Sequence, residues 1–229
     1  MKLLAIELSS AVGSVALAVD GRVAERTIHS PRAQQALVLP LVDELLREAG
    51  LEPRALDAVA FGRGPGSFTG LRIAAAVAQG LGLAARLPLL PVSSLAALAQ
   101  RAWREGGVEA ALTCVDAHMG EVYWAAYAIE DGVAAPRGEE RLGPPEAVEP
   151  PAGGAWAAVG DGFAAHAAAL AAVTARASRV WQDLRPAARD LLPRAERDLA
   201  AGRHTPPEEA LPVYLRGAGA WGKRGGEST

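Results

Sequence analysis

A glycine-rich stretch at residues 61–73 is the first place in this sequence where the residues suggest chemistry. It reads Phe-Gly-Arg-Gly-Pro-Gly-Ser-Phe-Thr-Gly-Leu-Arg-Ile. Glycine adopts positive φ readily and lets other backbone approach closely, and Ser67 or Thr69 can cap a helix that begins here. Free N–H groups at a helix start attract anions. We therefore expect a candidate nucleotide or anion loop made of Arg63, Gly64, Gly66, Ser67 and Thr69.

The spacing of these glycines matches neither common phosphate-binding motif. A Walker loop ends in Gly-Lys-Ser/Thr, and this stretch contains no lysine. A dinucleotide fingerprint that starts at Gly62 and Gly64 requires Gly or Ala at the place held by Ser67. Two interpretations stay open: an anion-binding loop, or a sharp strand-to-helix turn that only requires tight packing.

The loop joins a predicted buried strand at 56–61 to a predicted helix at 71–87. Small residues lie four apart along this helix, and larger apolar ones lie beside them: Gly70, Ala74, Ala78 and Gly82, then Ile73, Val77 and Leu81. Because small residues allow another element to come close, this surface packs either on the protein's own sheet or against a helix of a partner chain.

A second predicted helix, at 33–49, precedes that strand and ends at Gly50. Its apolar residues, among them Leu37, Leu41 and Leu45, follow helical spacing. Pro40 lies inside it, and an interior proline costs about 3 kcal/mol. We expect a kink or a broken first part there.

The histidines, two acidic residues and the cysteine are the candidates for catalytic or metal-binding roles. The four histidines, at positions 29, 118, 166 and 204, include no pair three or four apart, so no helical metal pair is predicted. Each histidine is expected on the surface or in a turn. Glu7 and Asp116 each follow an apolar run and could act as ligands, whereas Cys114 lies within an apolar strand and is expected to be inert.

The chain shows two successive units with a similar opening. In the first, the runs at 3–8, 14–19 and 22–28 predict a three-stranded meander, with Asp20-Gly21 as a hairpin turn. In the second, the runs at 110–115 and 121–127 repeat the pattern of a strand, an acid, a turn and a return strand. We expect an N-terminal lobe at 1–104, a smaller lobe at 105–216 and a flexible tail at 217–229.

The later elements are expected from local patterns. Residues 132–154 predict a loop-rich insertion, since prolines, glycines and glutamates dominate there. Short strands are expected at 156–160 and 178–181, and helices at 163–175 and 186–202, the second interrupted by Pro193.

Composition limits the environment of the protein. One cysteine in 229 residues excludes an internal disulfide and suits a reducing, cytoplasmic setting. We expect no membrane span, since no apolar run looks long enough, and the N-terminus lacks a signal-peptide pattern. The net charge is −3 with scattered basic residues, so we expect contact with nucleic acid only through another subunit.

Three stretches resemble the TsaB (YeaZ) family of the tRNA threonylcarbamoyladenosine machinery. They are the glycine stretch from Gly62 to Ile73, the block from Asp116 to Trp124 and the block from Pro212 to Arg216. The resemblance implies an α/β fold of the actin-like superfamily, with two lobes and a duplicated core. It also implies a non-catalytic scaffold subunit that binds TsaD, the catalytic subunit, alongside the ATPase TsaE.

This resemblance carries further expectations about partners and cofactors. No cofactor is expected, except ATP or ADP within the complex, and the protein alone is expected to form a homodimer. The predicted partner surface comprises Leu37, Leu41 and Leu45 of the first helix with Gly70, Ile73, Ala74, Val77 and Leu81 of the second. The rival hypothesis is an independent kinase, ATPase or glycoprotease-like hydrolase that uses Glu7 and the loop from Gly64 to Thr69.

Overall fold

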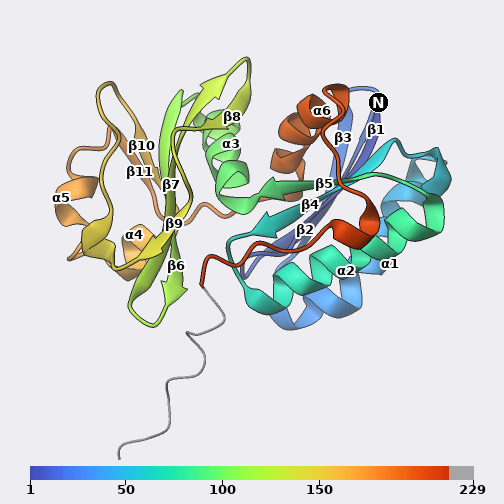
Figure 1. The fold of residues 1–229 in the computed structure, drawn as a ribbon, viewed down its shortest axis with the longest axis horizontal. Coiled ribbons are helices and arrows are strands. Elements are labelled where there is room, and N and C mark those ends of the chain that lie inside the picture. The colour runs from blue at the N-terminus through green and yellow to red at the C-terminus, as the bar shows by residue number, and fades with distance from the viewer. Residues whose placement is uncertain (217–229) are drawn as a thin grey trace, which may run out of the picture.

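The computed structural model describes residues 1–216 as two sheets side by side (Figure 1). The first sheet is built from β1 (Lys2–Glu7), β2 (Gly13–Val19), β3 (Arg22–Ile28), β4 (Ala58–Gly64) and β5 (Leu89–Ser93). Its order is β3-β2-β1-β4-β5. The first three strands form an antiparallel meander, as predicted, and β4 and β5 add parallel to β1.

The second sheet repeats the first. Its main strands are β6 (Ala110–His118), β7 (Glu121–Glu130), β8 (Val133–Pro136), β10 (Ala157–Val159) and β11 (Arg179–Trp181). The order β8-β7-β6-β10-β11 and the pairing directions match those of the first sheet, with β6 in the place of β1. A short extra strand, β9 (Arg141–Gly143), pairs with β7. The predicted α/β class with a duplicated mixed-sheet core is confirmed.

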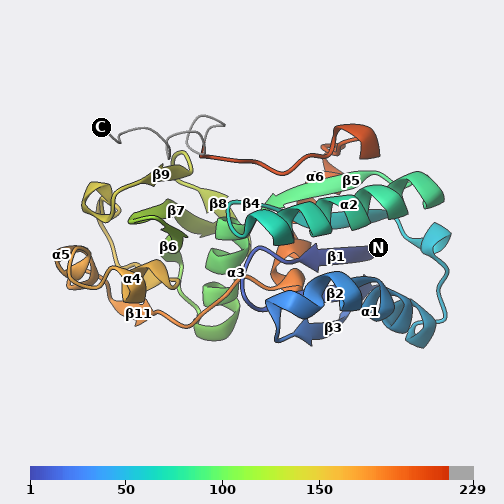
Figure 2. The ribbon, with the colours of Figure 1, turned by 90° about the horizontal axis from the view of Figure 1, so that it is seen from below.

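Helices cover the first sheet on both faces. On one face α1 (Gln34–Glu48) and α2 (Phe68–Ala85) lie side by side (Figures 1 and 2). On the other face lies α6 (Leu192–Ala200), whose Leu192 and Ala195 pack against Leu3 and Ala5 of β1. Between the two sheets runs α3 (Ser94–Gly106), which is capped by Ser93, whose Oγ accepts from the amides of Leu95 and Ala96 at 3.2 Å.

Three predicted helices differ from the observed ones. Residues 163–175 form only two single turns, α4 (Gly162–Ala165) and α5 (Ala171–Thr174). The segment holds only two large buried residues, Phe163 and Leu170, so no continuous apolar face supports a longer helix. In α6, Pro193 lies in the first turn, where no amide donor is required, and so begins the helix rather than interrupting it. In α1 the helix continues through Pro40 without a break.

The helix α2 also corrects an expectation about membranes. By length and composition alone, this helix could span a membrane. In the structure its Leu71, Ala74, Ala75 and Ala78 are buried against the first sheet, so it is a core helix. The predicted flexible tail at 217–229 lies outside the described residues.

The last described segment, residues 205–216, is here called the C-terminal strap. It starts beside β5, where Thr205 and Leu89 exchange two backbone hydrogen bonds of 2.9 Å. It then passes α2, where Gln79 Nε2 donates to the carbonyl of Ala210 at 3.1 Å. At its end Arg216 reaches the turn between β6 and β7 in the second sheet. The strap therefore connects both lobes, and the lobe boundary at 104/105 stays a prediction.

Candidate functional site: the cleft between the lobes

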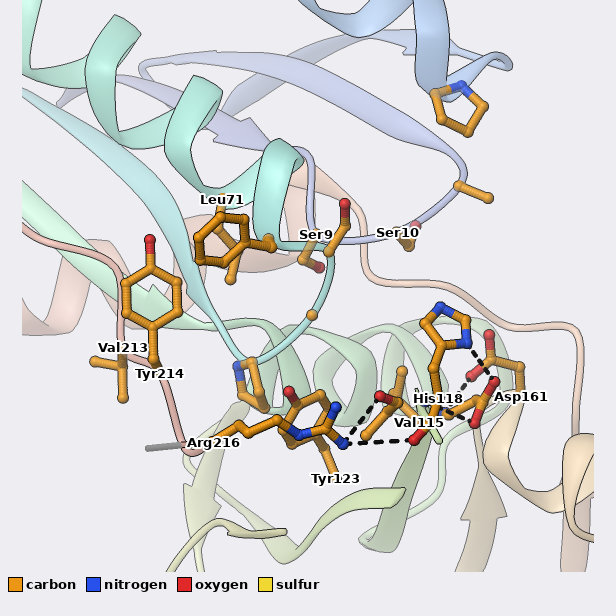
Figure 3. Close-up of a pocket in the computed structure, with 18 of the residues that line it drawn as sticks. Ser9, Ser10, Leu71, Val115, His118, Tyr123, Asp161, Val213, Tyr214 and Arg216 are labelled. Atoms are coloured by element: carbon orange, nitrogen blue, oxygen red, sulfur yellow. Dashed lines mark hydrogen bonds and ion pairs between the residues drawn. The ribbon is translucent and has the colours of Figure 1, made fainter. Parts of the chain in front are cut away.

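A cleft of about 940 Å³ lies between the two sheets (Figure 3). The first lobe supplies the β1–β2 loop and the start of α2, the second supplies the end of β6 with its turn, and the strap closes one side. Its principal lining residues are Ser9, Ser10, Pro65, Ser67, Leu71, Arg72, Val115, Asp116, His118, Met119, Tyr123, Asp161, Tyr214 and Arg216. Pockets of this size between domains are common sites for small ligands.

The glycine loop forms the sharp turn from β4 into α2. Of the two predicted capping residues, Ser67 and Thr69, Ser67 is the N-cap: its Oγ accepts from the amide of Gly70 at 3.3 Å. The amide of Ser67 donates to the carbonyl oxygen of Ser9 at 2.7 Å. Gly66 has a φ of 156°, and a Cβ there would lie 2.5 Å from that same oxygen. Close packing on the β1–β2 loop therefore explains this glycine.

The other predicted loop residues separate in space. Gly64 has a φ of 102° and packs against Leu71 and the strap. Thr69 is exposed in the first turn of α2. Arg63 does not line the cleft, since its guanidinium binds the Glu140 carboxylate of the second lobe at 3.1 Å. Anion binding by this loop stays a prediction.

Arg72 stands at the mouth of the cleft, one turn into α2. Its guanidinium lies 3.8 Å from the centre of the Phe68 ring, and its Nε donates to the Tyr214 hydroxyl at 3.2 Å. The Phe68 and Tyr214 rings are 5.3 Å apart, centre to centre. This cluster attaches the strap to the start of α2.

Glu7 does not face the cleft. It is fully buried, and its carboxylate accepts from the amide of Ser9 at 2.7 Å and from the Ser94 hydroxyl at 3.0 Å. A Cβ at position 62 would collide with this carboxylate, so Gly62 makes room for it. Burial raises the pKa of Glu7 above its usual 4.5, although the hydrogen bonds oppose that shift.

Asp116 holds two imidazoles at the opposite wall. Its carboxylate lies 3.0 Å from Nδ1 of His118 and 3.1 Å from Nε2 of His166. Its own amide donates to Asp161 at 3.1 Å. Burial acts to raise the pKa of Asp116, but the hydrogen bonds from His166 and from the His118 amide outweigh it, so the pKa falls below its usual 3.8.

Sequence reasoning missed His166 and Asp161. His166 lies in a turn, as predicted, but it is also half-buried and bound to a carboxylate, which the prediction did not include. Asp161 was not singled out, although it lies between two glycines directly after a short predicted strand. That Gly-Asp-Gly pattern was the available signal.

The arrangement supplies oriented imidazoles but no assembled metal centre within residues 1–216, where no group of three acidic, histidine or cysteine side chains could hold an ion. Neither imidazole is hydrogen-bonded to a serine in that part of the chain. Cys114 is buried, and burial raises its pKa, which keeps the thiol protonated and unreactive.

The residues predicted for the partner surface divide into two groups. Leu45 of α1 and Gly70 and Ala74 of α2 are buried on the inner faces of these helices. A Cβ at position 70 would collide with the Leu8 carbonyl. These three lie inside the protein and not on its surface. Leu37 is 41% exposed, while four others are partly buried and reach the surface: Leu41, Ile73, Val77 and Leu81.

Comparison with known proteins identifies the family. The protein TsaB of Escherichia coli K12, a tRNA threonylcarbamoyladenosine biosynthesis protein, is 41% identical over 231 residues, which cover 99% of this chain and all of that protein. The chain belongs to the TsaB (YeaZ) family. A family model described as tRNA N6-adenosine threonylcarbamoyltransferase, TsaD, matches residues 24–172.

Solved TsaB-family structures share this architecture. YeaZ from Pseudomonas aeruginosa is 42% identical, with a TM-score of 0.88 over 93% of this chain and 99% of that one. A curated TsaB from Haemophilus influenzae is 43% identical over 124 residues, about half of each chain. The predicted resemblance is thus confirmed.

Proposed function

We propose that this TsaB-family protein is a non-catalytic scaffold subunit in threonylcarbamoylation of N6 of the tRNA adenosine next to the anticodon. In this role it binds and stabilises a TsaD-like catalytic subunit, in the cytoplasm and alongside a TsaE-like ATPase. It contacts tRNA only through the complex and forms a homodimer when alone. Any ATP or ADP would be bound only within the complex.

The observation that carries this proposal is the exposed apolar surface of α1 and α2. Leu37 and Leu39 of α1 are 41% and 52% exposed, and Leu83 of α2 is 62% exposed. On the same two helices Leu41, Ile73, Val77 and Leu81 are only partly buried against the core. Large apolar side chains left exposed on the outer helices of a protein suit a protein-binding surface.

Two contacts argue against the rival enzyme hypothesis. The carboxylate of Glu7 is directed into the interior and bonded to Ser9 and Ser94, so it does not face a ligand in the cleft. The Ser67 Oγ accepts from the helix amide of Gly70, which is the role of a cap. Both residues therefore have structural roles that account for them.

The test is light scattering with size-exclusion chromatography on the protein alone and mixed with TsaD from the same source. The variant Leu37→Glu with Val77→Glu should lose both the homodimer and the mixed complex. The matched control, Val180→Glu with Leu211→Glu, changes residues that are 37% and 64% exposed outside α1 and α2 and should keep both. Circular dichroism checks that each variant folds.

Undiminished binding of TsaD by the Leu37→Glu, Val77→Glu variant would refute the proposed binding surface. An ATPase activity of the lone protein that disappears with Glu7→Ala would refute the non-catalytic role. These outcomes are independent, so each part of the proposal can fail separately.

A further inference from the structure

The cleft between the lobes takes no part in the proposed function, and its charges are unevenly matched. Asp116 is bonded to two imidazoles, and Asp161 lies 3.6 Å from the Arg185 guanidinium. Arg216 pairs with Glu121. Arg72 contacts an aromatic ring and a tyrosine hydroxyl, and within residues 1–216 it has no carboxylate partner. Arg72 is therefore a cation at the mouth of the cleft with no anionic partner among the described residues.

One hydroxyl that lines the cleft is left without a partner. The Tyr123 side chain is half-buried, and its hydroxyl has no hydrogen-bond partner in the described part of the chain. The Ser9 side chain also lines the cleft, but it is hydrogen-bonded to Glu7. Both Asp116 oxygens and both Asp161 oxygens have partners. An acceptor of a bound ligand can therefore take the hydrogen of the Tyr123 hydroxyl.

The remaining lining is mainly apolar. Pro65 and Leu71 face it from the first lobe, and Val115, Met119 and Tyr123 from the second. The labelled side chains in Figure 3 surround this space from both lobes and from the strap. A ligand made only of charged groups would leave those side chains without contacts, so the body of the ligand should be apolar.

We propose that the cleft is a binding site for a small organic acid, with its oxyanion group held by Arg72 and the Tyr123 hydroxyl and its flat apolar body packed between the lobes. The carboxylate or phosphate of such a ligand would supply the negative charge that pairs with Arg72 and an acceptor for the Tyr123 hydroxyl. The residues proposed for partner binding on α1 and α2 do not line the cleft, so partner binding and ligand binding can be tested independently.

The test uses three probes on the full chain: 2-naphthoate, its uncharged amide 2-naphthamide, and inorganic phosphate. The sequence contains only two methionines, which makes methyl NMR with labelled methionine a specific reporter. Met119 lines the cleft, whereas Met1 lies at the far end of the first lobe (Figure 1). Naphthoate should shift the Met119 signal and leave that of Met1 unchanged.

Titration calorimetry then measures the affinities. We expect naphthoate to bind at least about tenfold more tightly than the amide, because one charge-assisted contact accounts for about that factor. Arg72→Met retains an apolar chain over Phe68 and should remove this preference, while amide binding stays within about twofold. Tyr123→Phe, which removes only the hydroxyl, should weaken naphthoate binding several-fold. The control Arg54→Met changes an exposed arginine outside the cleft and should have no effect.

Equal affinities for acid and amide would overturn the proposal, as would unchanged naphthoate binding by Arg72→Met. The absence of any Met119 shift at millimolar naphthoate would also overturn it. If phosphate binds as tightly as naphthoate, the inference that the ligand has an apolar body is refuted. Light scattering of the same variants mixed with TsaD measures partner binding. Failure of the ligand proposal can therefore be distinguished from failure of the proposed scaffold role.

Discussion

Glu7 and Asp116 occupy equivalent places in the two halves of the duplicated fold, yet only Asp116 lines the cleft. Each lies toward the end of the central strand of its sheet, in β1 and β6. Glu7 is bonded to Ser9 and Ser94 inside the first lobe, whereas Asp116 is half-buried and orients two histidines. The repeat therefore supplies a structural acid in one lobe and a cleft acid in the other.

Replacing Glu7 by Gln should alter how stability depends on pH. Because the folded pKa of Glu7 is raised above 4.5, the folded state retains the proton longer than the unfolded state. Wild-type stability should fall as pH rises from about 4.5 through the folded pKa, and then level off. Glu7→Gln, which can still bond Ser9 and Ser94, should lack this fall and be the more stable protein at pH 8.

Urea unfolding of both proteins across pH 4–8 measures this effect. If the free energy of unfolding changes with pH in the same way for both proteins, the pKa of Glu7 does not differ between the folded and unfolded states. The variant Glu48→Gln, at an exposed carboxyl on α1, serves as the control.

Two glycines of α2 should respond oppositely to alanine. At Gly80 an added Cβ meets nothing within 4 Å, so Gly80→Ala should raise the free energy of unfolding by about 0.5–1 kcal/mol through helix propensity. At Gly70 the added Cβ would collide with the Leu8 carbonyl, so Gly70→Ala should destabilise the protein. Thermal unfolding of the two variants measures these opposite effects. Equal shifts in Tm for Gly80→Ala and Gly70→Ala would contradict this packing.

The burial of Leu45 can be tested against the exposure of Leu37 on the same helix. Leu45 is 1% exposed, so Leu45→Ala should cost about 2–5 kcal/mol, whereas Leu37→Ala should change stability by less than about 1 kcal/mol. Binding of TsaD should show the reverse order when both variants are measured at a temperature where they are folded. A large loss of stability in Leu37→Ala would mean that this side chain is part of the core.

Arg216 should hold the turn between β6 and β7 in place. Its guanidinium donates to the carbonyls of Ala117 and His118 at 3.3 and 3.4 Å and pairs with Glu121. Arg216→Ala leaves these carbonyls without that donor, so hydrogen exchange at residues 117–121 should accelerate severalfold while exchange in β1 stays unchanged. Arg137→Ala, at an exposed arginine of the same lobe, is the control. Unchanged exchange in the turn would show that the strap does not restrain it.

The sequence by itself determined the order of the elements and the local turns. The first meander, the strand into the glycine loop, and the caps at Ser67 and Ser93 all follow from residues close together in the chain, because turns and caps are set by local chemistry. Twelve consecutive residues around the loop were also specific enough to indicate the family, which the comparison over nearly the whole chain confirmed.

Only the tertiary structure decided which side of each helix faces inward and which distant groups meet. Helical spacing placed Leu37 and Leu45 in one predicted surface, but the position of the sheet buries one and leaves the other exposed. The contact of Asp116 with His166, and of Arg216 with the turn of β6 and β7, joins residues far apart in sequence. Such contacts depend on how segments that are distant in the chain fold against one another, and no local sequence pattern predicts that.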